Sequence, residues 1–108
     1  MKWISFQLQP YLNLDIRITD VIEVLNKKMI VPEIQEGDDN GIYINVNFKT
    51  QNPIFTWLDC RTELFNCIGF KESSIVTCEG ECGWDDYLLL HHFDPKEKLN
   101  NISVKENI

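Results

Sequence analysis

The chain has 108 residues, of which 44% are hydrophobic and 11% aromatic, and its formal net charge at pH 7 is −7. This length fits one domain and leaves no room for a second core, and the apolar content argues against general disorder. The acidic balance disfavours nucleic acid and anionic membranes as partners, and no run approaches the roughly 18 apolar residues of a membrane span.

The first residues alternate polar and apolar side chains, which predicts a strand over Trp3–Leu8. This alternation is unlike the continuous apolar core of a signal peptide, so we expect a cytoplasmic protein whose four cysteines are thiols. Pro10 interrupts the pattern, and a second alternating run over residues 12–18 predicts another strand.

A helix is predicted after this run. Asp20 is its expected N-cap, with Glu23 three residues later as in a capping box. The apolar residues that mark one helical face are Val21, Ile22, Leu25 and Met29.

The next segment has the pattern of a hairpin. Residues 31–35 predict a short strand, and Pro32 favours an edge position because it has no backbone N–H to donate. The loop that follows ends in Asn40-Gly41, a dipeptide typical of tight hairpin turns. Regular alternation over Ile42–Phe48 then predicts the clearest strand of the chain.

The segment from Pro53 to Phe70 fits two patterns. Residues 54–58 could extend as a strand, but apolar spacing further on favours a helix over about 57–68, closed by Gly69. We adopt the helix.

Two last strands are predicted, over 74–79 and 86–93, joined by a loop over 80–85. Residues 96–108 are polar and are expected to form a loosely held tail. The element order predicts a single α+β domain over 1–108, with a mostly antiparallel or mixed sheet and about two helices packed on one face.

The acidic residues are segregated along the chain. Residues 29–48 and 72–95 together hold ten carboxylates and no Lys or Arg, whereas the remaining residues are net positive. Acidic surface held in blocks attracts cationic partners. We therefore expect a basic protein as partner.

A zinc site is one alternative. Cys78 and Cys82, followed by His91 and His92, superficially offer four ligands. However, adjacent residues of a strand point to opposite faces, so only one histidine could join the two cysteines. Treating three of the cysteines as small apolar core residues explains them without a metal or cofactor. A disulfide between Cys78 and Cys82 is disfavoured in the cytoplasm.

Calcium binding and catalysis fit less well. Residues 36–41 match the opening of an EF-hand loop, but Asn47 stands where the bidentate glutamate belongs. His91 with Asp85 or Asp94 can be drawn as a base and its orienting group, yet no nucleophile context, oxyanion hole or phosphate-binding loop accompanies them. We predict no catalytic residues.

The acidic blocks and their aromatic neighbour remain as the candidate binding residues. Trp84 stands among carboxylates in the predicted loop, as in a binding hot spot with apolar burial at the centre and charge around it. A structural role for Trp84, as a cap on the core, is equally compatible with the sequence. The predicted partner-binding residues are Glu79, Glu81, Trp84, Asp85 and Asp86, with a second patch of Glu36, Asp38 and Asp39.

The chain as a whole resembles bacterial immunity proteins of contact-dependent inhibition and polymorphic toxin systems. The resemblance rests on small size, one acidic α+β domain, no catalytic signature, and a composition typical of an AT-rich gene, with no alanine and much Ile and Asn. It implies a cytoplasmic, non-enzymatic inhibitor of a cognate toxin, often a basic nuclease. These families share no motif, so the resemblance assigns no residues.

Two alternatives stay open. A DNA-mimicking inhibitor of a host or defence protein would be acidic for the same electrostatic reason. A small metal-binding or enzymatic domain would depend on Cys78 or His91. The sequence leaves the oligomeric state open.

Overall fold

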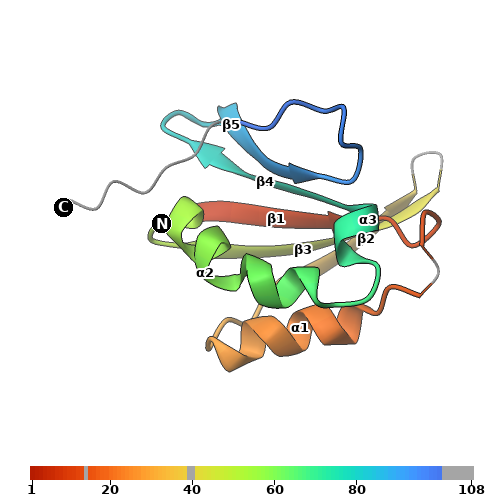
Figure 1. Cartoon of the computed structure of the whole chain (residues 1–108). Coiled ribbons are helices and arrows are strands. Elements are labelled where there is room, and N and C mark those ends of the chain that lie inside the picture. The colour runs from red at the N-terminus through yellow and green to blue at the C-terminus, as the bar shows by residue number, and fades with distance from the viewer. Residues whose placement is uncertain (14, 39–40, 101–108) are drawn as a thin grey trace.

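A computed structural model describes residues 1–13, 15–38 and 41–100, and five strands and three helices lie within them (Figure 1). The strands form one antiparallel sheet in the order β2-β3-β1-β4-β5. The predicted α+β class is confirmed. In chain order the elements are β1 (Lys2–Leu8), α1 (Ile18–Lys27), β2 (Glu33–Asp38), β3 (Ile42–Thr50), α2 (Pro53–Phe65), α3 (Phe70–Ser73), β4 (Ser74–Gly80) and β5 (Gly83–His92).

The helices cover one face of the sheet, and no described helix covers the other face, which we call the open face (Figure 1). The alternation of β1 explains this division. Ile4, Phe6 and Leu8 are buried beneath the helices, whereas the residues between them point to the other side. Ser5 of β1 stands between Asn47 of β3 and Thr77 of β4, so the centre of the open face is polar.

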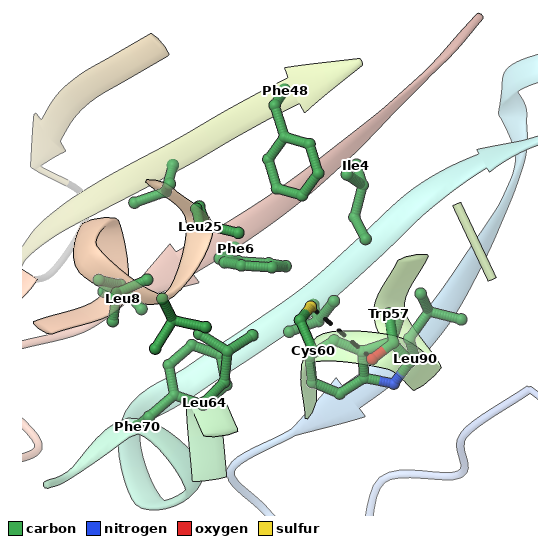
Figure 2. Packing of buried hydrophobic residues seen from close by; sticks show 14 of the residues in the cluster. Ile4, Phe6, Leu8, Leu25, Phe48, Trp57, Cys60, Leu64, Phe70 and Leu90 are labelled. Carbon is green, nitrogen blue, oxygen red and sulfur yellow. Dashed lines mark hydrogen bonds between the residues drawn. The ribbon is translucent and has the colours of Figure 1, made fainter. Parts of the chain in front are cut away.

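Aromatic side chains fill the core between sheet and helices (Figure 2). The ring of Phe6 lies edge-on to Phe48, Trp57 and Phe70, with centroid separations of 5.5, 6.0 and 5.8 Å. Such pairs contribute about 0.5–1.5 kcal/mol each beyond burial alone. Phe6 therefore joins the sheet to both α2 and α3.

The segment before α1 differs from the prediction. Residues 12–13 and 15–18, the described part of the predicted strand, do not form one. The N–H groups of Leu12 and Asn13 instead donate to the carbonyls of Gln9 and Pro10 in successive turns. The helix begins at Ile18, so Asp20 lies in its first turn instead of capping it. A carboxylate there still complements the positive end of the helix dipole.

Helix α2 exists as predicted but occupies earlier residues. Pro53 stands in its first turn, and the Asn52 side chain accepts a hydrogen bond from the Phe55 N–H at 3.1 Å. Asparagine as N-cap followed by proline is a strong start signal, and the apolar spacing used for the prediction overlooked it. The helix ends at Phe65, and Gly69 (φ 80°) is the N-cap of the short α3 that follows.

The β2–β3 hairpin is confirmed, with β2 on the edge of the sheet directly after Pro32. Asn40 lies outside the described residues. At the other hairpin the predicted long loop is wrong, because Gly80 pairs with Gly83 and β5 already includes Trp84 and Asp85.

The described part of the predicted tail returns to the sheet edge. The N–H of Asn100 donates to the Leu89 carbonyl at 2.9 Å, and its Oδ1 accepts from the Leu89 N–H at 2.7 Å. Residues 101–108 lie outside the described structure. No helix within the described ranges is long and apolar enough to cross a membrane.

Candidate binding surface

Strand β5 contains a large bulge next to the β4–β5 turn. Cys78 pairs with Leu88 and Gly80 pairs with Gly83, so four residues of β5 stand opposite Glu79 alone. We call these four residues, Trp84–Tyr87, the β5 bulge. All four are exposed. Bulges of this kind redirect side chains and are enriched near functional sites.

The absence of a side chain at Gly80 lets the bulge fold back on the turn. A Cβ atom at residue 80 would overlap the backbone carbonyl oxygen of Asp86. The Cys82 N–H donates to Asp86 Oδ1 at 2.8 Å, and Gly83 adopts a left-handed conformation with φ 79°. The close contact at Gly80, the hydrogen bond to Asp86 and the conformation of Gly83 therefore fix the conformation of the bulge.

Two aromatic side chains flank two carboxylates within the bulge. Trp84 is 44% exposed and Tyr87 is 54% exposed, with Asp85 and Asp86 between them. The sequence prediction included Trp84 and both aspartates but missed Tyr87. The signal that could have found it is the break in alternation from residue 83 to 87, which a regular strand would not show.

The acidic residues of the turn differ in how firmly they are held. Glu79 Oε1 accepts a hydrogen bond from the backbone N–H of Trp3 at 2.6 Å. Asp86 is held by its hydrogen bond from the Cys82 N–H. Glu81 and Asp85 make no side-chain hydrogen bond within the described residues. None of these acids joins an ion pair there; those pairs are Arg17–Asp20, Lys28–Asp59 and Lys28–Glu63. The acidic turn therefore forms no ion pair with a described base, although Lys2 lines the same depression as Glu79, Glu81 and Asp86.

Trp84 reaches the open face, where it lines a shallow depression of about 430 Å³ together with Trp3. Asp86 lines a second depression, of about 480 Å³, beside Asn52 and Pro53 at the start of α2. The β5 bulge thus lies between two hollows of the surface.

The two predicted acidic patches lie at opposite corners of the sheet. β2 and β5 are the two edge strands. Asp38 pairs with Ile42, beyond the Leu8 end of β1, whereas Gly80 lies near the Lys2 end. With ordinary strand spacing and rise, the corners are roughly 30 Å apart. Glu36 and Asp38 are exposed but do not join Trp84 in one patch, and Asp39 lies outside the described residues.

The four cysteines do not form a cluster. Cys60 and Cys78 are buried, and burial raises the pKa of their thiols to about 12 and about 11. Cys67 is partly buried and Cys82 is exposed. The described ranges contain no group of three or more residues placed to hold a metal ion.

His91 is a core residue. Its ring stacks on Phe70 at an interplanar angle of 15° and lies 5.0 Å from the Phe65 centroid. Its Nε2 is 3.0 Å from the Lys71 carbonyl oxygen, which fits a neutral ring donating from that nitrogen. Burial lowers the pKa of His91, so the neutral form is favoured in the fold.

Comparison with models of known protein families, with curated proteins and with solved structures gives no match. The function is therefore inferred from the surface described above.

Proposed function

We propose that this protein binds and neutralises a basic toxin domain, a nuclease, in the cytoplasm, as an immunity protein does. The observation that carries the proposal is the β5 bulge. It exposes two aromatic rings around two carboxylates, beside a turn whose acids form no ion pair with a described base. Trp84 supplies apolar area for burial, and the carboxylates match the Lys and Arg side chains of a nuclease.

The two kinds of group would act at different stages of binding. Carboxylates such as Asp85 and Glu81 attract a basic surface at long range and speed encounter by about ten- to a thousandfold at low salt. Aromatic anchors such as Trp84 and Tyr87 exclude water once contact is made and slow dissociation. Blocking the lysines and arginines that hold phosphate would leave the nuclease without substrate.

The placement of the acids favours this proposal over a DNA-mimicking inhibitor. A duplex presents closely spaced charges along a continuous path. Here the patch at Glu36 and Asp38 and the patch at the β4–β5 turn are separated by strands β3 and β1 and by most of the sheet length. One compact acidic and aromatic patch better suits a protein partner of ordinary interface size.

The test is capture of partners from the native organism with the tagged protein, washed at low and then high salt. We expect one basic toxin or nuclease fragment, kept by the wild type and reduced by Asp85→Lys and by Trp84→Ala. Asp85 is the better site for charge reversal, because Asp86 also holds the turn.

The matched controls change an aspartate and an exposed aromatic residue elsewhere. Asp15→Lys reverses an exposed acid near the opposite end of the sheet, and Phe55→Ala removes an aromatic ring that is 57% exposed on α2. Both control variants should capture the basic protein as well as the wild type does. The proposal fails if no basic protein is retained, or if the bulge variants capture as much as the controls.

A further inference from the structure

The depression on the open face exists because small side chains stand among large ones. Its floor lies over Ser5 and Thr77, which are neighbours in the register of β1 and β4. Trp3 and Trp84 form walls, and they come from strands separated by β4. The remaining polar wall consists of Glu33, Gln35, Asn45 and Asn47.

Two acceptor groups of this wall, on Asn45 and Glu33, have no partner among the described residues. The Oδ1 atom of Asn45 is buried and accepts no hydrogen bond from any described residue. Neighbouring amides are already ordered, because Asn47 accepts from Ser5 Oγ at 2.6 Å and donates to Gln35 Oε1 at 3.2 Å. The carboxylate of Glu33 has no ion pair among the described residues. A donor-rich cationic group would pair with the exposed Glu33 carboxylate.

The aromatic walls suit a flat cation. Lys49 Nζ lies 5.1 Å from the centre of the Trp3 ring, so this indole already contacts a cation within the fold. An incoming guanidinium would use the other face of the ring or displace the exposed Lys49 side chain. A guanidinium group is planar, stacks on aromatic faces and carries five donors but no acceptor. Its chemistry therefore matches both the indole rings and the acceptor atoms.

We propose that the depression receives an arginine side chain of the basic partner, stacked against Trp84 and Trp3 and paired with Glu33. This inference rests on the proposed function and specifies which partner side chain the open face recognises. The site lies beside the β5 bulge, so both would belong to one continuous interface that crosses from β5 to β2.

A sugar is the rival ligand, since indole rings and amide side chains also bind carbohydrates. The carboxylate of Glu33, which has no ion pair among the described residues, and the net charge of −7 favour the cation. A neutral sugar carries no positive charge to pair with Glu33. A comparison of charged and neutral probes therefore separates the two ligands.

The test is an NMR titration that follows the indole N–H signals of the three tryptophans. The probe is N-acetyl-L-arginine amide. Its neutral analogue is N-acetyl-L-citrulline amide, and methyl β-D-glucoside represents a sugar. We expect the arginine probe to shift the Trp3 and Trp84 signals and to leave buried Trp57 unchanged. The citrulline and glucoside probes should shift none of them.

Two pairs of variants locate the site. Glu33→Gln should weaken arginine binding by about tenfold. Glu36→Gln makes the same change on the same strand, but its register partner is Ile44 on the helix side, so binding should be unchanged. Trp84→Ala should weaken arginine binding, whereas Phe55→Ala should not.

The inference is overturned if the arginine probe shifts neither indole, if the glucoside shifts them instead, or if Glu33→Gln binds as tightly as Glu36→Gln. These outcomes are separable from the proposed function. Toxin capture that depends on Asp85 without arginine binding would reject only the inference. Arginine binding without any captured basic protein would reject only the proposed function.

Discussion

Asp86 Oδ1 accepts a hydrogen bond from the Cys82 backbone N–H at 2.8 Å, which ties the β5 bulge to the β4–β5 turn. Asp86 therefore contributes shape as well as charge. Its replacement by Lys would change both, whereas Asp85 makes no side-chain hydrogen bond within the described part of the chain. Charge and shape can thus be tested at adjacent positions.

Gly80→Ala is expected to destabilise the fold by about 1–3 kcal/mol, because the added Cβ would overlap the Asp86 carbonyl oxygen and the backbone must shift. Urea unfolding of the purified variant measures this cost. Gly37→Ala is the control, since the atoms nearest to its Cβ belong to the end of the Tyr43 side chain, which can rotate away, and not to the backbone. Equal costs at both glycines would contradict the described packing of the bulge.

Phe6→Ala is expected to lower the free energy of unfolding by about 3–5 kcal/mol, because it removes the ring that contacts Phe48, Trp57 and Phe70. Phe6→Leu should cost less, which keeps the test informative if the alanine variant does not fold. Phe55→Ala should change stability little, since that ring is 57% exposed. A small loss at Phe6 would contradict its central place in the core.

His91 is expected to make the fold less stable in acid. Burial lowers its pKa in the folded state, so below about 6.5 the unfolded chain takes up the proton first and the unfolding free energy falls with pH. Lys71, Glu72 and His92 are the titratable neighbours that act on it. The measurement is urea unfolding at several pH values between 7.5 and about 5.

His91→Phe is the comparison, because it keeps a ring against Phe65 and Phe70 and removes the titrating group. The stability of the wild type relative to this variant should decrease as pH falls. All other titratable groups are the same in both proteins. A constant difference across the range would show that His91 is not held in its neutral form.

Cysteine reactivity is expected to follow burial. At pH 8, iodoacetamide should modify exposed Cys82 first, and Cys60 and Cys78 should react only after unfolding in urea. Burial raises the pKa of both buried thiols, so the reactive thiolate is scarce in the fold. Peptide mapping by mass spectrometry reads out each site. Labelling of Cys60 at the rate of Cys82 would contradict the packing of α2 on the sheet.

Local patterns predicted much of the fold. Alternation in Ile42–Phe48 and in Trp3–Leu8 reflects strands with one buried and one open face, so these strands were placed correctly. The strand predicted over 12–18 was wrong for two reasons. Turns form after Pro10 in spite of the alternation, and Ile18 also fits the helical spacing of α1. Period-2 spacing alone does not separate these outcomes.

The candidate surface was less predictable. Trp84 and its acids could be singled out from charge and loop placement, but Trp3 joins them only because β4 pairs between β1 and β5. The bulge depends on the glycine at residue 80 and on a side-chain bond to the Cys82 N–H. Such contacts between neighbouring strands have no periodic signal in the sequence.

The most direct test of the central proposal measures the rates at which the captured toxin domain binds and leaves the wild type, Asp85→Lys, Trp84→Ala and Asp15→Lys. At low salt we expect Asp85→Lys to slow association about tenfold, an effect that shrinks at high salt, and Trp84→Ala to speed dissociation. Asp15→Lys should leave both rates almost unchanged. Identical rates for all four proteins would place the toxin interface away from the β5 bulge and contradict the proposal.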